Sequence, residues 1–435
     1  MTLAPTHDPP APPAPTPRGR PGRLLALGVA VVVVLAANAT ALALIGGSSA
    51  STAVAPPAPE PTSEVTEPPP PQPPLTSAPP TTEAPAPPPT VPDTPLEREV
   101  AELSRFVADQ RELEFLRPVE VELLTGQAFV DRLLRDVEEN REETDQSEKV
   151  LRALQLIDPG VDLFESFVSF YRDAVLGFYD PETDELVVRG AELTAYTRTT
   201  LAHELAHALD DQHFELYRPE VYDADDESAL AFSSLIEGVS LSVEFAYRQT
   251  LSPEEQDQSA RQAAEFAGRS GSSPIPSIVS SLAQFPYLAG PTFVGALLEE
   301  GAEPRVDQAY REPPTTSEEI LDPGVYLRGE DPVAVPTPPA DGPVVDEGVY
   351  GEWALSLTLG ELLGSAVGSR AADGWGGDRY VAWDEGGRTC VRMAYAMDSP
   401  AELDELEGAW RQWAQAHGDA TVERAAEVVT VTACG

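Results

Sequence analysis

Proline sets the first limit on what this chain can fold into. The sequence holds 45 prolines, many of them within the first 95 positions, where fixed φ angles and missing N–H groups disfavour helices and sheets. Residues 46–95 consist largely of Pro, Ala, Thr, Ser and Glu and have almost no large apolar side chains, so they cannot bury a core. We expect an extended, polyproline-like spacer there. About 340 residues remain, enough for one large domain or two modest ones.

An apolar run precedes the spacer. Residues 24–45 (LLALGVAVVVVLAANATALALI) contain no charged side chain and can cross roughly 30 Å of hydrocarbon as a helix. Arginines precede the run and no basic residue follows it until Arg98, which predicts a cytoplasmic segment over 1–23 and an extracytoplasmic remainder. The alternative is a cleaved signal peptide, cut at 37–39 or 41–43. We favour an uncleaved anchor because the run exceeds the about 7–15 apolar residues of such signals.

Charge and cysteine content restrict the environment of the chain. Its 28 basic and 73 acidic residues give a net charge of −45, and such a field repels nucleic acid and anionic lipid headgroups. We therefore expect neither as a partner. The two cysteines, Cys390 and Cys434, form an even pair in a region expected outside the cytoplasm. We favour one disulfide over two buried free thiols.

The pattern of the remaining residues predicts an α+β fold in which helices outweigh strands. Helical spacing covers 96–116, 127–140, 148–157, 163–170, 194–214, 227–250, a segment after Tyr350, and 400–417. Strand-like runs are 119–124, 174–179, 185–189, 380–384, 389–397 and 428–433. A turn with hairpin chemistry, DPETD, separates the second and third runs, so we expect hairpins rather than βαβ crossovers. The folded region is 96–435, and a Pro-rich loop over 331–345 would set off a C-terminal α/β subdomain over 346–435.

Three of the five histidines lie between positions 203 and 213. His203 and His207 enclose Glu204 in an HExxH pattern, and side chains at i and i+4 project from one helical face. Both imidazoles can therefore reach one Zn²⁺ at about 2.0–2.1 Å. Glu204 lies about 100° round the helix, beside the metal, where it can take a proton from a water molecule and pass it to a leaving group. The alternative is a surface helix that carries histidines and a solvated Glu. We favour the metal site, because a chance HExxH match is rare in a chain with only five histidines.

A catalytic zinc needs a third protein ligand and one open position. His213 points roughly 80–120° away from the other two histidines and is a poor candidate. We favour Glu237, which lies in the middle of a predicted helix among apolar and small residues. The less favoured candidates are Glu227 and Asp211.

Gly238, directly after this glutamate, costs the helix about 1 kcal/mol relative to Ala. Close packing against the HExxH helix would explain that cost. The alternative is that Glu237 is an ordinary exposed side chain on a solvated stripe with Ser233, Ser240 and Glu244.

HExxH followed by a distant Glu on a second helix resembles the gluzincins, the thermolysin-like division of zinc metallopeptidases. Between about 170 and 245, the stretches FYDPETDELVV, TLAHELAHALDDQHFEL and LIEG are similar to membrane-anchored bacterial metallopeptidases of poorly known substrate. Weaker similarity lies at 314–327 and 374–380. The resemblance implies a zincin-like domain in which a hairpin or small sheet packs on the HExxH helix. By the same resemblance the zinc ligands are His203, His207 and Glu237, with Glu204 as general base.

Two positions depart from that pattern. Val239 stands where such proteins often carry an acidic residue, so we expect a contact to the metal ligands to be missing. Asp322 stands where they often carry His, which leaves that position without an expected role.

A peptidase also needs a donor for the developing oxyanion. The sequence offers Arg379 and Tyr380, in a glycine-rich stretch, and Tyr326; plain turn chemistry is the alternative for them.

These observations predict a zinc peptidase that acts on a peptide or protein outside the membrane. One alternative is a zinc amidase for cell-wall peptides. Another is a non-catalytic envelope protein for binding or scaffolding, against which the intact Glu204 argues.

Overall fold

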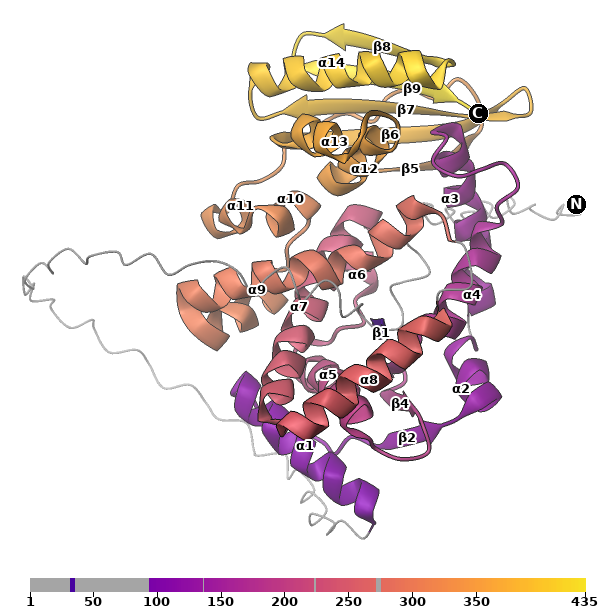
Figure 1. Cartoon of the computed structure of the whole chain (residues 1–435). Helices are drawn as coiled ribbons and strands as arrows, with labels where there is room; N and C mark the ends of the chain where they lie inside the picture. Colours follow the sequence, from indigo (N-terminus) through magenta and orange to yellow (C-terminus); the bar gives the residue numbers. More distant parts are fainter. Residues whose placement is uncertain (1–31, 36–93, 136, 223, 271–274) are drawn as a thin grey trace, which may run out of the picture.

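The computed structural model describes residues 32–35, 94–135, 137–222, 224–270 and 275–435. Helices make up most of these residues, and the strands form one sheet of four and one of five. The predicted α+β class with a majority of helices is therefore confirmed. In Figure 1 the helices around the smaller sheet fill the lower part of the molecule, and the larger sheet lies at the top.

The smaller sheet has the strand order β1–β3–β4–β2. At its centre, β3 (Val175–Asp180) and β4 (Glu185–Arg189) form the predicted antiparallel hairpin. β2 (Val121–Leu124), however, pairs with β4 in parallel, so the expectation of hairpins throughout is wrong for this strand. The helices between β2 and β3 provide the long connection that a parallel pairing requires; they are α2 (Gly126–Leu133), the 3-10 helix η1 (Val137–Asn140), α3 (Arg141–Ala153) and α4 (Leu163–Ala174).

β1 (Val32–Leu35) covers the outer edge of β3 in antiparallel pairing, with Val34 opposite Gly177. These four residues belong to the expected membrane anchor over 24–45, whose other residues lie outside the described part. The described residues form a strand where a helix was expected. Valine is β-branched and favours strands, so an apolar run rich in valine is compatible with either structure. The anchor stays a prediction, as does the spacer over 46–95, most of which also lies outside the described residues.

α5 (Ala195–Phe214) is the central helix of the lower part. Its first turn is closed by a capping box between Thr194 and Thr197. Most of its side chains are buried because strands and helices pack around it. The helices in contact are α1 (Pro95–Arg111), α7 (Asp226–Thr250) and α8 (Pro253–Ser270). The predicted helices over 194–214 and 227–250 are thus confirmed.

α9 (Ser277–Arg311) was not expected from the sequence. Proline removes a helical hydrogen bond, and this helix contains three: Pro286, Pro291 and Pro304. It is interrupted at Gly301 and Ala302, whose dihedral angles are not helical. Packing along α7 stabilises it despite these interruptions. Short helices complete this part: α6 (Pro219–Tyr222), α10 (Ser317–Leu321) and α11 (Pro323–Arg328).

Among the described residues, α7 alone is long and apolar enough to span a membrane by length and composition. However, 72% of its most apolar window is buried inside the protein, which is typical of a core helix.

The larger sheet is antiparallel, with the order β5–β6–β7–β9–β8. Its strands are β5 (Val344–Gly348), β6 (Trp375–Glu385), β7 (Arg388–Met397), β8 (Ala420–Ala425) and β9 (Val428–Cys434). Figure 1 shows α12 (Gly351–Leu363), α13 (Ser365–Ala372) and α14 (Pro400–His417) beside it. Cys390 and Cys434 lie opposite each other on β7 and β9 and are joined by a disulfide, as predicted.

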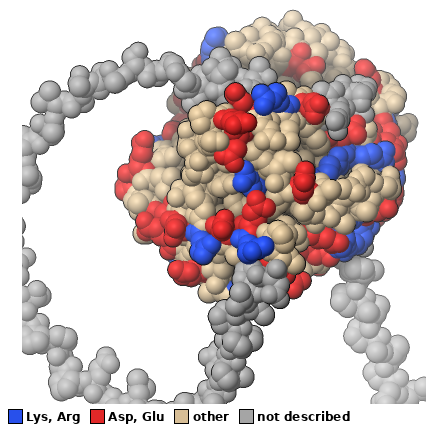
Figure 2. All heavy atoms as spheres, turned by 60° about the horizontal axis from the view of Figure 1, so that its bottom comes forward, with Lys and Arg blue, Asp and Glu red and all other residues tan. Residues whose placement is uncertain are grey.

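Charged side chains are mixed on the surface. The face drawn in Figure 2 carries many acidic groups with basic groups interspersed, and this face shows no broad basic patch. This excess of acidic groups agrees with the negative net charge of the whole chain, −45.

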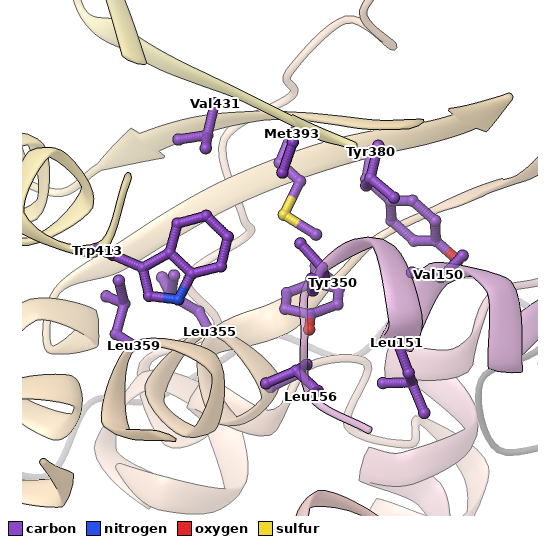
Figure 3. Packing of buried hydrophobic residues seen from close by; sticks show 14 of the residues in the cluster. Val150, Leu151, Leu156, Tyr350, Leu355, Leu359, Tyr380, Met393, Trp413 and Val431 are labelled. Carbon is purple, nitrogen blue, oxygen red and sulfur yellow. The ribbon is translucent and has the colours of Figure 1, made fainter. Parts of the chain in front are cut away.

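The larger sheet shares its core with the N-terminal half. Figure 3 shows Val150 and Leu151, from α3, near Tyr350, Tyr380 and other side chains of the C-terminal region. The range 346–435 therefore has its own sheet and helices but completes its core with residues far away in sequence.

Candidate metal centre

The three side chains that the sequence singled out as metal ligands meet between α5 and α7. His203 and His207, one turn apart on α5, have ring centroids 4.6 Å apart. Glu237 approaches from α7, with Oε2 at 3.1 Å from Nε2 of His203 and 3.8 Å from Nε2 of His207. One ligand atom from each residue lies within 4.8 Å of the other two. This spacing suits a single metal ion with nitrogen and oxygen ligands.

Gly238 allows a close helix crossing, but with a different helix from the one expected. A Cβ at Gly238 would overlap the backbone carbonyl of Gly290 on α9, and a Cβ at Gly290 would overlap the carbonyl of Ser234 on α7. The glycine after Glu237 therefore serves the α7–α9 contact, and the expectation that it serves packing on α5 is wrong. The reason is that the glycine lies one helical position, about 100°, round α7 from Glu237, which faces α5.

Two side chains of α7 contact the Nδ1 atoms of the histidine rings. Nδ1 of His203 lies 3.2 Å from Oε2 of Glu244, and Nδ1 of His207 lies 2.9 Å from Oγ of Ser240. These contacts occupy Nδ1 of both rings and leave the Nε2 atom of each ring toward Glu237. Ser240 is fully buried and Glu244 is 8% exposed. The alternative of a solvated stripe is therefore wrong, and Glu244 supplies the acidic contact that Val239 led us to expect missing.

Burial and mutual contacts shift the pKa values of all three ligand candidates. Burial opposes the charged form of His203, yet hydrogen bonds with Glu237 and Glu244 raise its pKa to about 10. Burial and the neighbouring His203 hold the pKa of His207 well below its usual value, and burial raises the pKa of Glu237. Nε2 of His207 is buried without a hydrogen-bond partner among the described residues. A buried ring nitrogen without a partner, beside the carboxylate of Glu237, fits a divalent cation that this nitrogen would bind.

Glu204 is the residue that the sequence predicted as general base. It is fully buried on α5, between the two histidines in sequence. A Cβ on Gly177 of β3 would lie 3.1 Å from Oε1 of Glu204 and 2.9 Å from Cγ2 of Thr200. Strand β3 thus lies against the carboxylate, and glycine at this position leaves the room that the carboxylate uses.

Tyr287 on α9 is a site residue that the sequence did not indicate. Its hydroxyl donates a hydrogen bond of 2.8 Å to Oε1 of Glu237. It lies in a stretch interrupted by proline, for which no element was expected, so no local signal could have connected it with Glu237, fifty residues away.

The expected oxyanion donors lie elsewhere. The hydroxyl of Tyr380 donates to Asp346 within the larger sheet, and the hydroxyl of Tyr326 donates to the carbonyl of Glu312. Arg379 lies on β6, where its backbone is opposite Ala394 of β7. Among the described residues no hydrogen bond or ion pair joins them to the metal centre, and their role as oxyanion donors stays a prediction. Their glycine-rich and aromatic surroundings belong to a folded sheet and to helix packing, which the sequence could not distinguish from a loop near a site.

The less favoured ligand candidates also have structural roles. Glu227 accepts a hydrogen bond from the amide of Ser317, Asp211 accepts from Tyr179 and from the amide of Leu216, and a ring nitrogen of His213 contacts the carbonyl of Glu114. Asp322 caps α11 through the amide of Gly324.

Comparison with known proteins covers only the C-terminal part. The family described as Domain of unknown function (DUF8575) matches residues 342–434, which hold the larger sheet and not the metal centre. No curated protein and no solved structure matches the chain.

Proposed function

We propose that this protein is a zinc metallopeptidase of gluzincin type, with a zincin-like catalytic domain that acts outside the cell membrane. The observation that carries the proposal is the convergence of His203, His207 and Glu237 on one point, with the buried Glu204 next to His203 on the same helix. Two nitrogens and one carboxylate oxygen form a donor set typical of catalytic zinc, which keeps a fourth position for water or substrate.

Each residue would have a defined role. A bound zinc ion supplies Lewis-acid chemistry, polarising a water molecule and the substrate carbonyl. Glu204 takes a proton from the attacking water on a carboxylate oxygen and delivers it to the leaving nitrogen. Glu244 and Ser240 keep the Nε2 atoms of the two histidines directed at the metal.

The edge of β3 supports a peptide substrate. β1 lies along that edge as an antiparallel strand, with Val34 opposite Gly177, and Gly177 is the residue that lies against Glu204. An extended peptide that replaced β1 at this edge would have its backbone beside the proposed general base. A zinc amidase for cell-wall peptides would use the same centre on a related bond.

Burial favours a second candidate, a non-catalytic envelope protein that retains the metal centre. His203, Glu204 and His207 are each 0% exposed, and Glu237 is 5% exposed. A substrate must displace part of what covers these side chains, whereas a structural metal needs no such access.

The test is Glu204→Gln in the purified full-length protein, which keeps side-chain size and all three ligands. Zinc content and thermal stability should match the parent, while hydrolysis of a broad peptide library falls by about 10²–10⁴. Glu405→Gln, on the exposed face of α14, is the matched control and should behave like the parent. Equal turnover by parent and Glu204→Gln would remove Glu204 from the mechanism. Zinc binding without turnover by either would favour the non-catalytic candidate.

A further inference from the structure

We infer that Tyr287 is a positioning residue that holds Glu237 as a one-oxygen metal ligand, and that the glycine crossing of α7 and α9 puts it there. The inference rests on the proposed metal binding. It concerns how the third ligand is held, which neither the HExxH pattern nor the position of Glu237 determines.

The two oxygens of Glu237 face different partners. Oε2 faces the histidines, at 3.1 Å and 3.8 Å from their Nε2 atoms. Oε1 accepts the hydrogen bond from Tyr287, at 2.8 Å. Because Oε1 is engaged, the carboxylate presents only Oε2 to a metal. Without the tyrosine hydroxyl, the carboxylate could rotate or offer both oxygens, and a buried oxygen would lose its donor.

The position of Tyr287 depends on the helix crossing. Gly290 follows it by three residues on α9, which is close to one helical turn, so both lie on the side that faces α7. The carbonyl of Gly290 occupies the space where a side chain at Gly238 would lie. Gly238 directly follows the ligand Glu237, so the two glycines bring the α9 backbone next to the residue that Tyr287 contacts.

A purely structural role for Tyr287 would depend on its ring. The ring packs against an apolar cluster under β3 that includes Phe178 and Val187. Tyr287→Phe keeps this ring and removes only the hydroxyl, so it separates packing from the hydrogen bond to Glu237.

The first experiment compares Tyr287→Phe with the parent in the full-length protein. Zinc affinity is measured by competition with a chelator, and ligand geometry by the visible absorption of the Co²⁺-substituted protein. We expect an affinity loss of about 10-fold or more and a changed Co²⁺ spectrum. Tyr326→Phe is the matched control, because its hydroxyl donates to the carbonyl of Glu312, away from the centre.

The second experiment tests the crossing with glycine substitutions on α9. Gly290→Ala would separate the helices and should lower zinc affinity in the same direction as Tyr287→Phe. Gly295→Ala is the control, since a Cβ there meets no atom within 4 Å. If Gly290→Ala fails to fold, Tyr287→Phe still decides the role of the hydroxyl.

The outcomes separate this inference from the proposed function. Parent-like affinity and an unchanged Co²⁺ spectrum in Tyr287→Phe would overturn the positioning role while the zinc site stands. A parent protein that binds no zinc would overturn the proposed function, and the inference with it.

Discussion

At the scale of single residues, the centre depends on small side chains as much as on its ligands. Gly177 has no side chain, and this leaves the space that the carboxylate of Glu204 occupies. A general base acts only when its oxygen lies within hydrogen-bond reach of the proton it takes. The packing on β3 therefore bears on the proposed role of Glu204 as general base.

Gly177→Ala should impair catalysis without removing the metal. The new Cβ would lie 2.9 Å from Thr200 and 3.1 Å from Glu204, so the carboxylate must shift, and a displacement approaching 1 Å can cost up to about 10² in rate. The measurement is kcat on a peptide substrate together with zinc content. Gly160→Ala, with no atom within 4 Å of its Cβ, is the control. Full activity in Gly177→Ala would show that the base tolerates the added methyl group.

At the scale of elements, a buried ionic network ties α1 and α9 to the helix that carries the histidines. Arg111, at the end of α1, pairs with Asp210 on α5 at 3.0 Å and also with Glu303 and Asp307 on α9. The hydroxyl of Tyr310 donates to the other oxygen of Asp210, at 2.8 Å. The network holds α5 in place three residues beyond His207.

Arg111→Met should destabilise the fold strongly. Arg111 is 2% exposed and Asp210 is 0% exposed, and removing one partner of a buried pair costs about 3–5 kcal/mol because the other charge stays buried. Urea unfolding measures the loss. Arg328→Met, which breaks an exposed pair with Glu330, should cost less than about 1 kcal/mol. Similar losses for the two variants would contradict a special role for the network.

At the scale of the whole molecule, acidic groups meet where α10 and α12 approach each other. Burial, followed by Asp398 and Glu352, raises the pKa of Glu318 to about 8. Burial, followed by Asp373 and Asp322, raises the pKa of Glu352 to about 8. The folded state thus binds more protons than the unfolded state between about pH 4.5 and 8.

Stability should therefore fall as pH rises through this window. The native carboxyls are protonated near pH 5 and must ionise in place by pH 8, which costs at most about 1.4 kcal/mol per pH unit and group, and less because both groups are partly exposed. Urea unfolding at pH 5 and pH 8 measures the slope. The double substitution Glu318→Gln and Glu352→Gln should flatten it, whereas Glu405→Gln should not. Equal slopes in parent and double variant would exclude these two groups as its source.

Membrane topology is a separate prediction at this scale. The run over 24–45 and the arginines before it predict that the folded region lies outside the membrane. Protease added to intact cells should remove the region after residue 46 and spare residues 1–23. A soluble product that starts near residues 40–50 in the medium would instead show signal cleavage.

The sequence by itself determined the features that arise from local spacing. Residues four apart on a helix share a face, so HExxH predicted that His203 and His207 would converge, and the hairpin turn predicted β3 and β4. Cys390 and Cys434 could be paired because only two cysteines exist. Glu237 was favoured because it lies in mid-helix among apolar and small residues, directly before a glycine, and because the resemblance points to it.

Only the tertiary structure decided what depends on contacts between distant segments. Glu244 and Ser240 differ from solvated side chains only because α7 packs on α5. Tyr287 belongs to the centre because α9 crosses α7 at Gly238 and Gly290. Likewise, β2 pairs with β4 in parallel although a long stretch of chain separates the two strands. Such contacts depend on which surfaces the folded chain brings together. The spacing of residues along the chain does not determine this.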